Sequence, residues 1–164
     1  CDEGIIAALY EASAAGVEIE LIVRGICCLK VGIPGISENI HVRSIVGNFL
    51  EHSRIFFFLN DGEEELYMGS ADWMPRNLDR RVEILFPMLD DTLKEKVKHI
   101  LDVELADNTK AHVLKPDGEY EKIDRRGKVL VNSQKQFCEE AVAAVPKTDH
   151  VYRERVFVPA EPAE

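Results

Sequence analysis

The chain begins with apolar residues at helical spacing: Ile5, Ile6, Leu9 and Ala12. This pattern predicts an amphipathic helix over residues 2–15, with Asp2 as its N-terminal cap. Gly16 suits the left-handed backbone that commonly ends a helix. The pattern then changes to alternation over residues 17–23 and turns wholly apolar, which predicts a strand that enters the middle of a sheet. Helix, glycine and strand in this order indicate an α/β fold.

The pattern in the middle of the chain predicts strands joined by turns. Glycine and proline predict a loop over residues 30–39, and imperfect alternation predicts a strand over residues 40–46. We expect one short helical turn over residues 47–51. The apolar run at residues 54–59 is expected to be the most buried strand. The turn Asn60-Asp61-Gly62 and the return Leu66-Tyr67-Met68 make it a β-hairpin.

Helical and strand patterns alternate again in the second half. A loop is expected after residue 72, followed by a strand over residues 81–85. An amphipathic helix follows over residues 90–105, and a small hairpin pairs residues 111–114 with residues 120–124. Ser133 can cap a last helix that runs to residue 145, with its inward side chains being Phe137, Ala141 and Val142.

These elements predict one α/β domain over residues 1–145, a mixed sheet flanked by helices, with residues 146–164 as a C-terminal tail. The abrupt start of the chain suggests a domain of a longer protein. No apolar run approaches the roughly 20 residues that a membrane span needs. The net charge of −10 argues against a nucleic-acid partner. The four cysteines lack CxxC spacing, so we expect buried free thiols and a cytoplasmic location.

Candidate chemistry gathers around the central hairpin. His52 and Arg54 stand two residues apart at the start of its first strand, which places them on one face. Ser70 and Asp72 follow the return strand, where Ser70 can donate a hydrogen bond to a ligand and Asp72 can orient an imidazole. Several arginines accompany them: Arg24, Arg43, Arg54, Arg76, Arg80 and Arg81. A titratable ring beside permanent cations points to phosphoryl chemistry.

Structural interpretations of the same residues stay open. A lone histidine in a strand is usually structural, and Arg24 at the end of a strand can equally be a rim residue paired with a carboxylate. Arg76, Arg80 and Arg81 fit a solvated, salt-bridged loop as well as a binding loop. Trp73 suits either a core position or stacking on adenine.

The spacing of His52 and Arg54 before Gly69-Ser70-Ala71-Asp72 resembles half of a phospholipase-D-type site, in which His-x-Lys precedes Gly-Ser-x-Asn. This sequence departs from that pattern at Arg54, at Leu59 and at Asp72. These departures speak against a hydrolytic phosphodiesterase.

Three longer runs resemble the C-terminal catalytic domain of bacterial polyphosphate kinase, the type with a phospholipase-D-like architecture. The runs cover residues 21–29, 45–54 and 70–83, and the resemblance extends over residues 2–145. It implies reversible transfer of the terminal phosphate of ATP to inorganic polyphosphate, with Mg²⁺, through a phosphohistidine carried on a preceding catalytic domain of the same chain. ATP, ADP and polyphosphate are the implied partners, the parent enzyme is expected to be a homo-oligomer, and the Mg²⁺ ligands are expected to lie outside this sequence.

The resemblance also implies roles for single residues. His52 corresponds to the second histidine, a proton donor or transition-state partner, and Arg24 to an arginine that contacts nucleotide phosphate. The full set of expected ATP- and phosphate-binding residues is Arg24, His52, Arg54, Ser70, Arg76 and Arg81, supported by Asp72. Two other functions stay open: a phospholipase-D-like phosphodiesterase or nuclease acting as a homodimer, and a non-catalytic anion-binding module.

Overall fold

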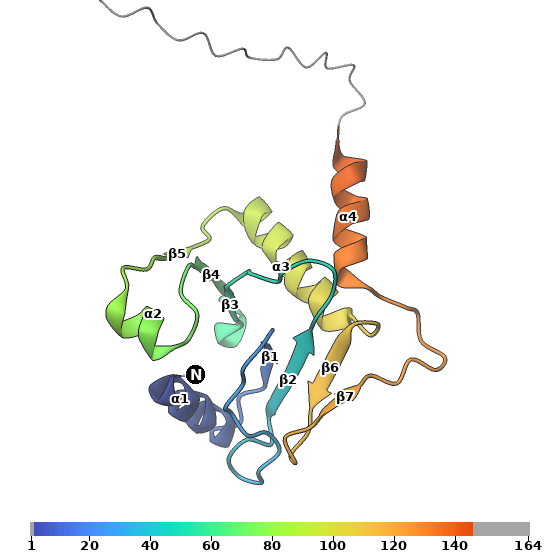
Figure 1. Cartoon of the computed structure of the whole chain (residues 1–164). Helices are drawn as coiled ribbons and strands as arrows, with labels where there is room; N and C mark the ends of the chain where they lie inside the picture. Colours follow the sequence, from blue (N-terminus) through green and yellow to red (C-terminus); the bar gives the residue numbers. More distant parts are fainter. Residues whose placement is uncertain (1, 146–164) are drawn as a thin grey trace, which may run out of the picture.

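The computed structural model describes residues 2–145, which form two small β-sheets with four helices around them (Figure 1). The first sheet is mixed and has the order β1 (Ile19–Ile22), β2 (Ile40–Ile45), β6 (Ala111–Leu114) and β7 (Tyr120–Lys122). Its first pair is parallel and the other two pairs are antiparallel. The second sheet is antiparallel and has the order β3 (Ile55–Phe58), β4 (Glu65–Gly69) and β5 (Leu85–Pro87).

The helices are α1 (Glu3–Ala14), α2 (Pro75–Arg80), α3 (Asp91–Ala106) and α4 (Ser133–Ala144). The predicted mixed sheet flanked by helices is therefore confirmed, with the strands divided between two sheets. No helix within residues 2–145 is long and apolar enough to cross a membrane. The tail predicted over residues 146–164 lies outside the described residues.

Local chemistry explains the element ends that the sequence predicted. The Asp2 carboxylate accepts a hydrogen bond from the Ile5 amide at 2.9 Å and caps α1. Asp90 caps α3 in the same way. Gly16 adopts a φ of +92°, which ends α1 without strain. The β3–β4 turn forms through Asn60 and Asp61, both at positive φ, a conformation that Asn and Asp tolerate better than most residues.

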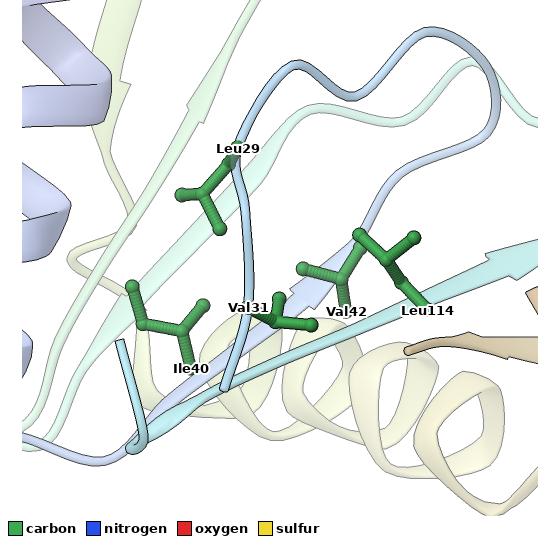
Figure 2. Close-up of a cluster of buried hydrophobic side chains, with 5 residues drawn as sticks. All are labelled: Leu29, Val31, Ile40, Val42 and Leu114. Carbon is green, nitrogen blue, oxygen red and sulfur yellow. The ribbon is translucent and has the colours of Figure 1, made fainter. Parts of the chain in front are cut away.

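The hydrophobic core lies against the first sheet. One cluster of its buried side chains consists of Leu29, Val31, Ile40, Val42 and Leu114 (Figure 2). Ile6 and Leu9 from α1 pack onto this cluster. Each such side chain contributes about 1.5–3 kcal/mol through removal from water. The most buried strand is β2, so the prediction that residues 54–59 form the most buried strand is wrong. The β3 aromatics instead pack on neighbours at the surface: Phe56 stacks on Trp73 and Phe57 lies under Lys98.

Three other local predictions are wrong. Residues 47–51 form no helix, because their hydrogen bonds go to distant side chains described below. The expected loop after residue 72 contains α2, which begins at Pro75, a residue whose fixed φ suits a first helical position. The strand expected over residues 81–85 lies at Leu85–Pro87, where it can pair with β4.

The last helix also differs from expectation. Its cap is Asn132, whose side chain accepts from the Lys135 amide, while Ser133 is already helical. Figure 1 shows α4 standing out from the body of the chain, so Ala141 and Val142 are exposed instead of inward. Cys28 and Cys138 are also exposed, against the expectation of buried thiols.

Candidate functional site

A cavity of about 770 Å³ lies where the ends of β1 and β3 approach α1 and α3. Most of its lining is apolar, contributed by residues such as Ile6, Leu21 and Phe56. Its polar lining includes Arg24, His52, Arg54, Asp72 and Glu104. A few charged groups set in an apolar wall are typical of a ligand site.

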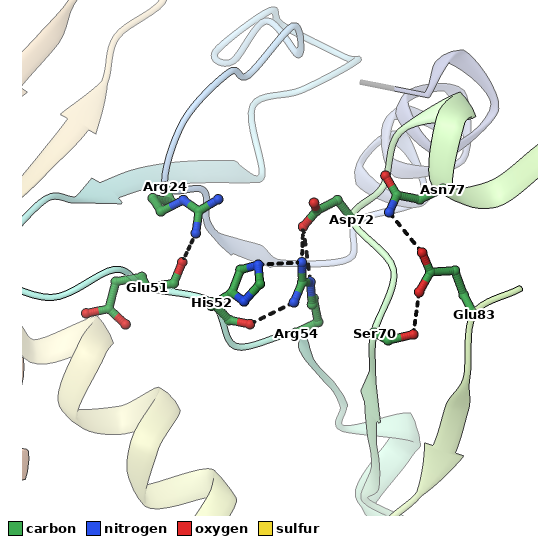
Figure 3. A network of polar contacts seen from close by, with 8 residues as sticks. All are labelled: Arg24, Glu51, His52, Arg54, Ser70, Asp72, Asn77 and Glu83. Atoms are coloured by element: carbon green, nitrogen blue, oxygen red, sulfur yellow. Dashed lines mark hydrogen bonds and ion pairs between the residues drawn. The ribbon is translucent and has the colours of Figure 1, made fainter. Parts of the chain in front are cut away.

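His52 lies at the surface three residues before β3, and Arg54 lies beside it (Figure 3). The Arg54 Nη2 atom is 3.0 Å from His52 Nε2, and Arg54 Nη1 donates to the His52 carbonyl oxygen at 3.0 Å. A guanidinium carries donors only, so Nε2 must accept, and the proton of the neutral ring is on Nδ1. The ring is exposed to solvent. Its Nε2 atom is occupied by Arg54, and its Nδ1 atom has the proton available for a ligand.

Asp72 holds Arg54 and does not contact the His52 ring. Its Oδ1 atom accepts a hydrogen bond from Arg54 Nε at 3.1 Å and forms an ion pair with Nη2 at 3.0 Å. The Arg54 side chain is 17% exposed, which makes this pair stiffer than an ordinary surface ion pair. Asp72 thus acts on the imidazole indirectly, by orienting the guanidinium that binds it.

Arg24 joins the same cavity from the end of β1. Its Nη1 donates to the carbonyl oxygen of Glu51, the residue that precedes His52. The second amino group of the guanidinium points away from this bond in Figure 3. Arg24 therefore holds the histidine segment while keeping donors for an anion. This places Arg24, His52 and Arg54 along one wall.

The structure brings Ser70 into a different network. Its hydroxyl donates to Glu83 and accepts from the Ile84 amide at 3.0 Å. Asn77 donates to the other Glu83 oxygen at 3.0 Å. The hydrogen bonds from Ser70 and Asn77, and then the positive charges of Arg81 and Arg54, hold the pKa of Glu83 below its ordinary value. This network fixes α2 to the hairpin, and Ser70 does not line the cavity.

The α2 arginines do not reach the cavity either. Arg76 and Arg81 are exposed, and neither belongs to the cavity lining. Trp73 does line it, with one ring face stacked on Phe56 at a centroid distance of 5.0 Å. The binding roles expected of Ser70, Arg76 and Arg81 stay predictions that this geometry does not support.

Glu104 on α3 is a polar residue of the wall that the sequence did not single out. It is 6% exposed, and its carboxyl forms a hydrogen bond with that of Glu51. Burial, followed by the charge and hydrogen bond of Glu51 and by the charge of Asp107, raises the pKa of Glu104 to about 7. The raised pKa means that Glu104 keeps its proton up to about neutral pH, beside the carboxyl group of Glu51. The sequence did contain a signal for this residue, because Glu104 is an acidic residue on the apolar face of a predicted amphipathic helix.

Within residues 2–145, no three His, Cys, Asp or Glu side chains lie close enough together to hold a metal ion. The cavity lining nevertheless contains acidic residues beside Arg24, His52 and Arg54, namely Asp2, Glu18, Glu20, Glu51, Asp72 and Glu104.

Comparisons with protein families and with single proteins both point to polyphosphate kinases. The family described as "Polyphosphate kinase C-terminal domain 2" matches residues 1–134. Polyphosphate kinase from Lactiplantibacillus plantarum is 53% identical over 149 residues, which are 91% of this chain and 21% of the relative. Polyphosphate kinase 1 from Chlorobaculum tepidum is 57% identical over 136 residues, 83% of this chain and 19% of the relative.

A solved structure is also similar. The crystal structure of polyphosphate kinase from Porphyromonas gingivalis superposes with a TM-score of 0.82 at 43% identity. The match covers 87% of this chain and 22% of that chain. The chain therefore spans about a fifth of the length of the proteins it matches.

Proposed function

Since the chain belongs to the polyphosphate kinase family through its C-terminal domain 2, we propose that it forms one side of the catalytic site of such a kinase. The reaction is reversible transfer of the terminal phosphate of ATP to inorganic polyphosphate. The observation that carries this proposal is the single wall formed by Arg24, His52 and Arg54 on one cavity. Phosphoryl transfer suits this wall, because its catalysis depends on positioning and on stabilisation of negative oxygens.

Each residue has a part in this proposal. Arg24 and Arg54 supply permanent positive charge for phosphate oxygens. His52 supplies a ring whose Nδ1 proton can be donated to a phosphate oxygen, while Arg54 occupies Nε2. Asp72 keeps Arg54 aligned through the hydrogen bond and the ion pair that its Oδ1 atom makes with the guanidinium.

The rest of the reaction is assigned to parts beyond this chain. The phosphohistidine forms on a preceding catalytic domain, where an imidazole nitrogen attacks the terminal phosphorus of ATP and ADP leaves. A terminal oxygen of polyphosphate then attacks the same phosphorus and frees the nitrogen. Mg²⁺ would accompany the nucleotide and be held there, since within residues 2–145 no three His, Cys, Asp or Glu side chains are grouped closely enough to bind it. We also infer that the parent enzyme is a homo-oligomer and that it is located in the cytoplasm, where ATP is available.

The test compares two proteins. The full-length kinase that carries this sequence should synthesise polyphosphate from ATP, and the 164-residue chain alone should bind nucleotide weakly and show no turnover. In the full-length enzyme, His52→Ala should lower kcat by roughly 10²–10⁴-fold. His41→Ala is the matched control, because His41 is an exposed strand residue outside the cavity lining.

Three results would contradict the proposal. Robust synthesis by the 164-residue chain alone would show that the site is complete without a second half. Global unfolding of His52→Ala, seen as a lost circular-dichroism melting transition, would make the residue structural. Cleavage of a bis-nitrophenyl phosphate by a dimer of the chain would favour a phosphodiesterase instead.

A further inference from the structure

The segment that carries His52 lacks the usual sources of rigidity. Residues 46–51 form no helix or strand, and no backbone-to-backbone hydrogen bond involves residues 46–53 among the described residues. Phe49 and Leu50 are 61% and 73% exposed, so burial does not hold the segment either. Its position depends on side chains from elsewhere in the fold.

Gln134 in the first turn of α4 supplies most of these contacts. Its Oε1 atom accepts from the Phe49 amide at 3.0 Å, and its Nε2 atom donates to the Phe49 carbonyl at 2.9 Å. The second Nε2 hydrogen is directed at Glu51 Oε1. One carboxamide therefore binds the backbone as a neighbouring strand would, and also binds the side chain next to His52.

Gln134 is itself held firmly. It is 7% exposed, and the adjacent Ser133 donates through its amide and hydroxyl to the Asp107 carboxylate at 2.8 and 2.9 Å. Gly47 packs directly on the carboxamide, since a Cβ built there would overlap Gln134 Oε1. The carboxamide is thus held by Gly47 on one side and by the anchored start of α4 on the other. A side chain held in this way can fix the position of the loop that it binds.

We propose that Gln134 is a positioning residue for His52, whose carboxamide holds residues 47–51 so that the imidazole faces the cavity beside Arg54. The catalytic part of this inference rests on the proposed function, while the structural part does not. Gln134 touches neither the ring nor the cavity, so its effect passes through Phe49 and Glu51.

The structural part is tested in the 164-residue chain by hydrogen exchange of the Phe49 amide. Gln134→Ala should accelerate this exchange at least about tenfold, because the acceptor is removed. Gln136→Ala is the matched control: it lies on the same helix and its carboxamide binds Glu140 instead. Equal Phe49 protection in the wild type and in Gln134→Ala would overturn the proposal.

The catalytic part is tested in the full-length enzyme. Gln134→Ala should lower kcat by roughly 10–100-fold, because small displacements of a catalytic group are costly. The KM for ATP should change less than about threefold, since Arg24 and Arg54 remain. Gly47→Ala displaces the Gln134 carboxamide from the other side of the contact, so it should also lower kcat with little change in KM. Gln136→Ala should match the wild type.

A rescue experiment separates positioning from a general role in folding. Gln134→Glu alone places a carboxylate against that of Glu51 and should resemble Gln134→Ala. Combining it with Glu51→Gln restores a donor between the two side chains and should recover at least about fivefold in kcat. No recovery, or faster Phe49 exchange with an unchanged kcat, would overturn the proposal. An inactive wild-type enzyme would refute the proposed function and leave the exchange result standing.

Discussion

Replacing Glu104 by Gln tests the carboxyl pair beside the candidate site. Glu104 is buried on α3 against Glu51, and Asp107 lies one turn further along. Glutamine has the same shape, carries no charge and still offers a donor to Glu51. The substitution therefore removes the ionisation of residue 104 and keeps its hydrogen bond.

The size of the effect follows from the pKa of Glu104, which is raised from 4.5 to about 7. This makes ionisation about 3 kcal/mol less favourable in the folded chain than in the unfolded chain. Between these two pKa values the folded chain keeps a proton that the unfolded chain has lost. The wild-type free energy of unfolding should therefore fall as pH rises from 4.5 to about 7. Relaxation of the pair reduces the net change to about 2 kcal/mol.

Urea denaturation at pH 5 and pH 8 measures this difference. Glu104→Gln should match the wild type within about 1 kcal/mol at pH 5 and be about 2 kcal/mol more stable at pH 8. Asp102→Asn is the matched control, because Asp102 is an exposed acid on the same helix. If the two free energies keep a constant difference across this pH range, Glu104 does not carry the proton and the reasoning fails.

The remaining predictions concern Asp107, which anchors the start of α4, and Arg54, which binds Asp72 and His52. Asp107→Ala should lower the free energy of unfolding by about 3 kcal/mol, since the fully buried carboxylate accepts from Ser133 and from backbone amides. Burial alone raises the pKa of Asp107, but these hydrogen bonds bring it below the ordinary value, so the loss should shrink as pH falls below 3.8 in urea titrations. Arg54→Lys should raise the KM for ATP about fivefold in the full-length enzyme, because lysine cannot bind Asp72 and His52 together. Its melting temperature should change little, as expected for a partly exposed ion pair; a large drop in calorimetry would make Arg54 structural.

Much of the local structure followed from short-range patterns. Asp2 caps α1 as predicted, the helix predicted over residues 90–105 forms at Asp91–Ala106, and Asn60-Asp61-Gly62 forms the turn between β3 and β4. These features depend on residues within about four positions of each other, so their physics is visible in the sequence. The errors came where a distant partner intervened. Residues 47–51 form no helical turn, because the Phe49 backbone is hydrogen-bonded to Gln134, which lies 85 residues away in the sequence.

The sequence by itself determined most of the order of helices and strands, the hairpin and the pairing of His52 with Arg54, because all of these arise between near neighbours in the chain. Only the tertiary structure decided which cations share a cavity. It placed Arg24 beside His52, left Arg76 at the surface and buried Glu104 against Glu51. Such contacts depend on how whole elements pack, and one sequence does not record the distance between residues far apart along it.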